Sequence, residues 1–315
     1  MNRQLYHYGT DESVPTYATN YVIVGVVVLG LVCHLFVSPP KAAIKVAVPS
    51  TPFGRRFTLH NVLWFHLIMF AASYLFAGIV HQSFYFMDCP GTELMVNETN
   101  GSTYTVEIAC PEGKQAVSRG LWGVTMFLQL IAVYQMVLLV PMTAGCMERM
   151  SGSTQKIFFF AVQALTLVLA IAAGALHSQG WFIVGISSIV FSFITTVAAF
   201  IGARSTMCGG KRVETKTVAS TFQNNHAYDM IFVSFLLSFI GLMVQLFGGS
   251  GCGGPDYTSG AIYRGSCSFP FDGRTGFNHN ALYHILEIVS KIVLVLASRR
   301  TVLDYSRLVP IDIPI

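Results

Sequence analysis

The sequence contains few charged residues. Asp, Glu, Lys and Arg make up only 11% of its 315 residues, whereas hydrophobic residues make up 53%. Soluble globular domains carry about 25% charged residues. This composition excludes an ordinary soluble domain and indicates an integral membrane protein.

The sequence also lacks any sign of a second domain. No internal repeat is visible, and no stretch between the hydrophobic runs is long enough to build a separate core. Residues 1–20 are polar and do not contain the apolar centre of a cleavable signal peptide. We therefore predict one membrane domain, residues 1–315, whose first span directs insertion.

Seven hydrophobic runs are each long enough to cross about 30 Å of hydrocarbon as a helix. The predicted fold is therefore all-α, a bundle of seven transmembrane helices with a polar cavity that opens outward. The spans are predicted at residues 21–37, 59–84, 121–143, 157–176, 181–203, 230–247 and 282–298.

The basic residues predict the orientation of this bundle. Thirteen of the nineteen Lys and Arg residues lie in alternate loops and the C-terminal tail, five lie on the other side, and Lys291 lies between. The positive-inside rule places the thirteen in the cytoplasm. The N-terminus is then outside or lumenal, the C-terminus is cytoplasmic, and the protein resides in the secretory pathway or the plasma membrane.

Glycosylation sequons and cysteines agree with this orientation. Asn97 and Asn100 begin two Asn-x-Ser/Thr sequons in the loop that follows the second span. Two predicted outer loops each hold two cysteines, which suits disulfide bonds in an oxidising compartment. The simplest pairing is Cys89 with Cys110 and Cys252 with Cys267, although four cysteines allow three pairings. The cysteines expected to stay free are Cys33, Cys146 and Cys208.

The net charge of +4 carries no information about nucleic acid. Basic loops on one side of a membrane protein produce such a charge by themselves. We expect membrane lipids as partners and no nucleic acid.

The last predicted span contains two charges near its middle, Glu287 and Lys291, and no other span does. Asn280, His284, Glu287 and Lys291 follow one another at spacings of four, three and four, which places them on one face of a helix. A charge inside a membrane faces protein or water and marks a candidate functional site. We expect this polar face to look into the bundle, with the two charges within about 4 Å of each other.

Four histidines lie at the outer ends of predicted spans, where helices of a bundle converge. Neutral imidazole is a good ligand for Zn²⁺, and a catalytic zinc site keeps one position for water. We predict His81, His279 and His284 as candidate metal ligands, with the imidazoles of His81 and His284 within about 8 Å. Asp88 is the candidate catalytic base or supporting carboxylate; the fourth outer histidine is His177.

Two short motifs resemble those of known membrane proteins. They are Ala77 to Gln82, read Ala-Gly-Ile-Val-His-Gln, and Phe277-Asn-His-Asn-Ala-Leu-Tyr-His-Ile-Leu, together with Thr19-Asn20 before the first span. They resemble a little-characterised group of seven-span proteins that is itself similar to the superfamily of alkaline ceramidases, progestin and adiponectin receptors and Per1-like hydrolases. The resemblance implies a shared fold, and metal-dependent hydrolysis of a lipid amide or ester in which His81 and His284 hold Zn²⁺ and Asp88 moves protons.

The sequence departs from the superfamily pattern at two positions. Ala77 stands where these hydrolases carry Ser, and Asn280 stands where they carry a second His. His279 is displaced by one residue, which rotates it about 100° around the helix. The alternatives are therefore a hydrolase-derived lipid-binding protein that no longer catalyses, or a non-enzymatic receptor or transporter.

Lys291 supports a different alternative, a photoreceptor. The run Leu286-Glu-Ile-Val-Ser-Lys-Ile resembles the seventh helix of retinal proteins, where a buried Lys carries the chromophore. That resemblance implies retinal on Lys291 and a counter-ion role for Glu287. The third span lacks the acidic residues of microbial rhodopsins, and the end of the seventh lacks the Asn-Pro-x-x-Tyr of animal opsins. A purely structural ion pair of Glu287 with Lys291 is the simplest interpretation.

Overall fold

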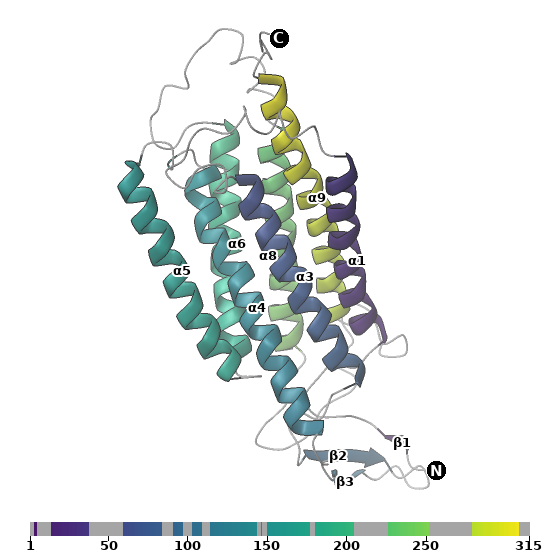
Figure 1. The fold of residues 1–315 in the computed structure, drawn as a ribbon. Coiled ribbons are helices and arrows are strands. Elements are labelled where there is room, and N and C mark those ends of the chain that lie inside the picture. Colours follow the sequence, from purple (N-terminus) through teal and green to yellow (C-terminus); the bar gives the residue numbers. More distant parts are fainter. Residues whose placement is uncertain are drawn as a thin grey trace.

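Seven long helices form the body of the protein in the computed structural model (Figure 1). The structure describes residues 3–4, 14–37, 59–83, 91–96, 103–108, 114–143, 146, 150–176, 180–204, 226–251 and 279–308. The helices are α1 (Val14–Val37), α3 (Leu59–Ser83), α4 (Lys114–Thr143), α5 (Gly152–Ala175), α6 (Gly180–Arg204), α8 (His226–Gly251) and α9 (His279–Leu308).

Each of the seven helices contains a stretch that is long and apolar enough to cross a membrane. The shortest helices have 24 residues, which at 1.5 Å per residue gives about 36 Å, more than the thickness of the hydrocarbon layer. The predicted seven-span architecture is therefore confirmed. Because the number of spans is odd, α1 begins and α9 ends at opposite ends of the bundle (Figure 1).

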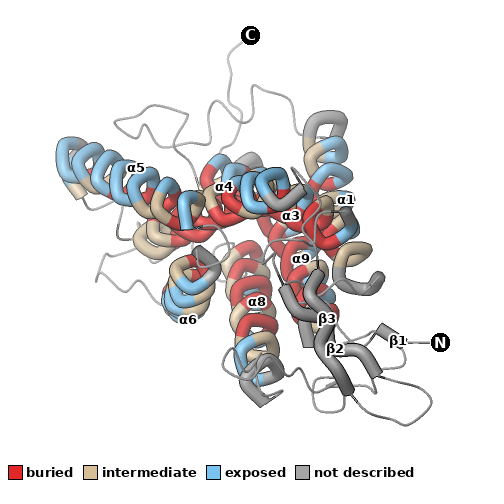
Figure 2. The backbone as a smooth tube through the Cα atoms, turned by 90° about the horizontal axis from the view of Figure 1, so that it is seen from below, coloured by how far each residue is buried: buried red, intermediate tan, exposed pale blue. Residues whose placement is uncertain are grey.

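The helices form two layers when the bundle is viewed along its axis (Figure 2). One layer runs in the order α5, α4, α3, α1, and the other in the order α6, α8, α9. Helix α9 packs against α8, α1 and α3, so its middle lies inside the bundle.

Small residues allow α9 to approach its neighbours closely. A Cβ atom added to Gly30 of α1 would lie 2.6 Å from a methyl group of Val295, and one added to Gly241 of α8 would lie 3.2 Å from the ring of Tyr283. Close backbone approach through small residues is typical of helix packing in membranes, where van der Waals contact replaces the hydrophobic effect. This packing holds α9 firmly between α1 and α8.

Three short strands lie beyond the bundle, near the end where α4 begins (Figure 1). Strand β2 (Gly91–Val96) pairs antiparallel with β3 (Thr103–Ile108), and β1 (Arg3–Gln4) adds to the other edge of β2. The all-α prediction did not include this sheet. Asn97 and Asn100 lie between β2 and β3, outside the described residues.

The cysteines give one correction. Cys33 is free and exposed, as expected, but Cys146 is disulfide-bonded, and its partner lies outside the described residues. The prediction that Cys146 is free is therefore wrong. Disulfides are rare in the cytosol, so this bond favours a non-cytosolic location for the C-terminal end of α4. The basic residues favour a cytoplasmic location for the same end. The predicted pairs Cys89–Cys110 and Cys252–Cys267 lie outside the described residues.

Candidate functional site

Lys291 lies inside the bundle at the middle of α9 and is completely buried. Its Nζ lies 2.8 Å from Oε2 of Glu287, one helical turn earlier, and Glu287 is only 2% exposed. Both charged groups contact Ser238 of α8, and Lys291 also contacts the Phe70 ring of α3. The predicted inward-facing ion pair is confirmed.

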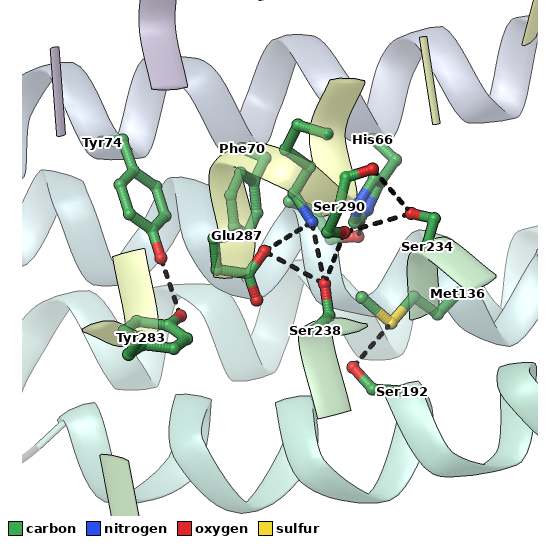
Figure 3. Close-up of polar contacts among 12 residues, drawn as sticks. His66, Phe70, Tyr74, Met136, Ser192, Ser234, Ser238, Tyr283, Glu287 and Ser290 are labelled. Atoms are coloured by element: carbon green, nitrogen blue, oxygen red, sulfur yellow. Dashed lines mark hydrogen bonds and ion pairs between the residues drawn. The ribbon is translucent and has the colours of Figure 1, made fainter. Parts of the chain in front are cut away.

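Helix α8 supplies a hydroxyl to both charges (Figure 3). Ser238 donates a hydrogen bond to Oε2 of Glu287 at 3.0 Å and accepts one from Lys291 Nζ at 3.3 Å. Because a buried charge is costly unless it is paired and hydrogen-bonded, this serine completes the site. The sequence analysis missed it.

Two more serines extend this contact between α8 and α9. The Ser290 hydroxyl lies 2.9 Å from that of Ser238, and Ser234 donates to the Ser290 carbonyl at 3.0 Å, with its Oγ 3.1 Å from Ser290 Oγ. All three side chains are buried. The four-residue spacing of Ser234 and Ser238 places both on one face of α8, which is the signal that was available in the sequence.

Aromatic side chains of α3 cover the other side of Lys291. Its Nζ lies 3.9 Å from the centre of the Phe70 ring, within the range of a cation–π interaction. Phe70 stacks on Tyr74 at 4.5 Å between ring centres and on His66 at 5.7 Å. Phe70 and Tyr74 belong to a different helix from Lys291, so the sequence alone does not show that they lie together.

His66, to which the sequence analysis assigned no role, borders the same site. It is fully buried, and its Nδ1 lies 2.8 Å from the carbonyl oxygen of Ala132 on α4. A carbonyl only accepts, so Nδ1 carries the proton and the Nε2 of the neutral ring is an acceptor. That Nε2 is buried and has no hydrogen-bond partner among the described residues. Buried polar atoms without a protein partner usually bond to a water or to a ligand group.

One helical turn before Glu287, α9 carries Tyr283 and His284. The Tyr283 hydroxyl lies 2.7 Å from that of Tyr74, and His284 Nδ1 lies 3.0 Å from the Thr19 hydroxyl of α1. The His284 ring packs against both tyrosines. These contacts join α9 to α3 and α1 one turn before the ion pair in the chain.

The structure describes only part of the predicted metal site. His81 packs edge-on against Trp122 of α4 at 5.4 Å between ring centres, whereas His284 contacts Thr19 and Tyr74. Within the described ranges, no three His, Cys, Asp or Glu side chains form a group that would hold a metal. Asp88, His177 and the side chains of His279 and Asn280 lie outside the described residues, so the hydrolase site stays a prediction.

The ion-pair site offers a specific kind of chemistry. Lys291 is a buried primary amine, and lysine amines form imines with carbonyl compounds. Glu287 supplies a fixed negative charge 2.8 Å away.

No protein-family model matches the chain, and no curated protein or solved structure matches it either.

Proposed function

We propose that this seven-helix membrane protein binds an apolar aldehyde as an imine on Lys291, with Glu287 as the counter-ion, and that the aldehyde is retinal. The observation that carries the proposal is the complete burial of Lys291 beside a single carboxylate at 2.8 Å. A charged residue inside a membrane helix is a functional-site candidate by default, and a buried ion pair by itself is weak evidence of a stabilising role. The resemblance of residues 286–292 to the seventh helix of retinal proteins supports the choice of ligand.

The charges of the site suit this reaction. The aldehyde carbon bonds to the Lys291 nitrogen, its oxygen leaves as water, and the protonated imine carries the same single positive charge as the ammonium. Glu287 therefore keeps its ionic partner before and after binding. Ser238, which bonds to both charged groups, holds the carboxylate in place.

The surroundings suit an apolar, conjugated ligand. Phe70, Tyr74 and Phe235 are buried next to the site, and π-faces of aromatic rings attract a delocalised cation. Met136 and Ser192 meet on the far side of Ser238 (Figure 3), with the Ser192 hydroxyl 3.8 Å from the Met136 sulfur. Methionine adapts its shape to a ligand more readily than branched side chains do.

The first test is reconstitution with retinal. Protein purified without ligand and then mixed with all-trans retinal should gain a visible absorption band, and borohydride reduction should add the retinyl mass to the peptide that contains Lys291. Lys291→Arg keeps the positive charge but removes the reactive amine, so this variant should stay folded and gain no band. Lys156→Met, which removes an exposed lysine at the start of α5, is the matched control and should behave like the wild type. A folded wild type that forms no adduct at Lys291 contradicts the proposal.

We also propose the orientation that the basic residues predict, with Asn97 and Asn100 glycosylated. Glycosidase should lower the apparent mass of the protein from a eukaryotic host, and the Asn97→Gln, Asn100→Gln double variant should lose that shift. The Cys146 disulfide makes this test informative, because it favours the opposite orientation. A wild-type protein that is never glycosylated, with Cys146 protected from thiol reagents until reduction, would reverse the assignment.

A further inference from the structure

Two histidines of α1 and α3 face each other beside Ser298, in the C-terminal part of α9. His34 lies near the end of α1, and His60 lies in the first turn of α3. Their Nε2 atoms are 3.2 Å apart and their ring centres 4.7 Å apart. In the sequence alone, neither histidine has a convergent partner, so neither was assigned a role.

A backbone carbonyl of α9 orients one of the two rings. His60 Nδ1 lies 2.9 Å from the carbonyl oxygen of Ser298. Since the carbonyl only accepts, His60 carries its proton on Nδ1, and the lone pair of its Nε2 points at His34. Metal-binding histidines are usually held in this way, with the second ring nitrogen donating to a carbonyl or carboxylate.

The separation of the two nitrogens matches a shared metal ion. Two imidazole nitrogens bound to one tetrahedral Zn²⁺ at about 2.0–2.1 Å lie roughly 3.3 Å apart, and the observed distance is 3.2 Å. We propose that His34 and His60 bind a divalent transition-metal ion of the Zn²⁺ type, which joins α1 to α3. Among the described residues, no third His, Cys, Asp or Glu joins the pair.

The neighbours of the pair define its environment. Trp64, one turn after His60, packs against both rings, with centres 5.3 Å from His34 and 6.4 Å from His60. The nearby charge is that of Arg299, which interacts with His34. Arg299 is exposed, and water or lipid headgroups screen its charge. The simpler alternative is a hydrogen bond between the rings, with the proton on His34 Nε2.

Metal titration of the purified full-length protein separates these two cases. Zn²⁺ added to chelator-treated wild type should raise the midpoint of thermal unfolding, because a ligand that binds only the folded state stabilises it. His34→Gln and His60→Gln should each abolish this shift, since either leaves one imidazole. His226→Gln, a histidine at the start of α8, is the control and should keep it. Each variant is compared with itself in chelator, so a change in basal stability does not affect the result.

Fluorescence provides a second measurement at the site itself. Cu²⁺ quenches nearby indoles, and Trp64 is one of only three tryptophans, so Cu²⁺ should remove about a third of the emission. Trp64→Phe should remove the quenched component, and His60→Gln should restore unquenched emission from Trp64. If neither Zn²⁺ nor Cu²⁺ affects the wild type, or if His34→Gln responds like the wild type, the contact is a hydrogen bond only and the proposal fails.

Discussion

Helix α9 packs inside the bundle and α5 lies at its edge, although both cross the same membrane. Helix α9 buries a lysine, a glutamate, a histidine and two serines, Ser290 and Ser298. Helix α5 has no charged residue between Ile157 and Ala175, packs mainly against α4, and leaves most of its outer face exposed (Figure 2). Its exposed apolar side chains include Ile157, Phe160, Leu165, Leu167, Val168 and Ile171.

The difference shows which residues distinguish the inside of a membrane bundle from its outside. Lipid is as apolar as leucine, so hydrophobicity does not separate the two faces of a helix. Polar groups do, because hydrocarbon cannot hydrogen-bond to them. In α9 the buried polar side chains Glu287, Ser290 and Lys291 point to α8 and α3, whereas the buried threonine of α5, Thr166, bonds back to its own helix at Val162.

The largest expected effect is the loss of one charge of the α9 pair. Lys291→Met or Glu287→Gln alone should lower the free energy of unfolding by about 3–5 kcal/mol, because the remaining charge or amide is buried without its partner. The double variant should be much closer to the wild type. Denaturation in detergent measures all three. Equal losses in the single and double variants would show that the two charges do not depend on each other.

A smaller difference is expected between leucines of the two regions. Leu63 of α3 is completely buried and Leu167 of α5 is 51% exposed. Leu63→Ala should cost about 2–5 kcal/mol because it leaves a cavity. Leu167→Ala should cost less than about 1 kcal/mol, since detergent or lipid fills the space. Equal costs would mean that α5 packs against a further surface.

Ser238→Ala should cost about 1–3 kcal/mol, the usual effect of removing a hydrogen bond to a buried charge. The matched control is Ser153→Ala in the exposed first turn of α5, where Ser153 bonds to Ser151 and a change within about 0.5 kcal/mol is expected. Thermal unfolding of both variants in the same detergent gives the comparison. An unchanged Ser238→Ala protein would show that Glu287 and Lys291 need no support from α8.

The smallest effect is expected at the tyrosine pair. Tyr74→Phe and Tyr283→Phe each remove one hydroxyl of a buried contact of 2.7 Å, and each should cost about 1 kcal/mol. In a double-mutant cycle the second substitution should cost less than the first, because the partner is already gone. Strict additivity would mean that each hydroxyl has another partner.

The sequence predicted what depends on one helix at a time. The spans follow from runs of apolar residues, and the inward face of α9 follows from the spacing of His284, Glu287 and Lys291. The strands β2 and β3 were missed although their signal is local, since residues rich in Thr and Val flank Asn100-Gly101, a frequent hairpin turn. The same residues also form the glycosylation sequons.

Contacts between helices could not be predicted in the same way. Ser238, Phe70 and His66 come from α8 and α3, and nothing in a single sequence states which turn of one helix meets which turn of another. The same reason explains why His34 and His60 were missed, and why the neighbours of His81 and His284, Trp122 and Thr19, were not foreseen.

The serines between α8 and α9 have one further consequence, which follows from counting protons. Each hydroxyl has one proton to give, and Ser238 gives its own to Glu287. The short contact from Ser290 to Ser238 then requires Ser290 to be the donor, whereas Ser234 gives its proton to the backbone carbonyl of Ser290. The O–H dipoles of Ser290 and Ser238 therefore form an ordered row that points one way, and the carboxylate of Glu287 stands at its positive end.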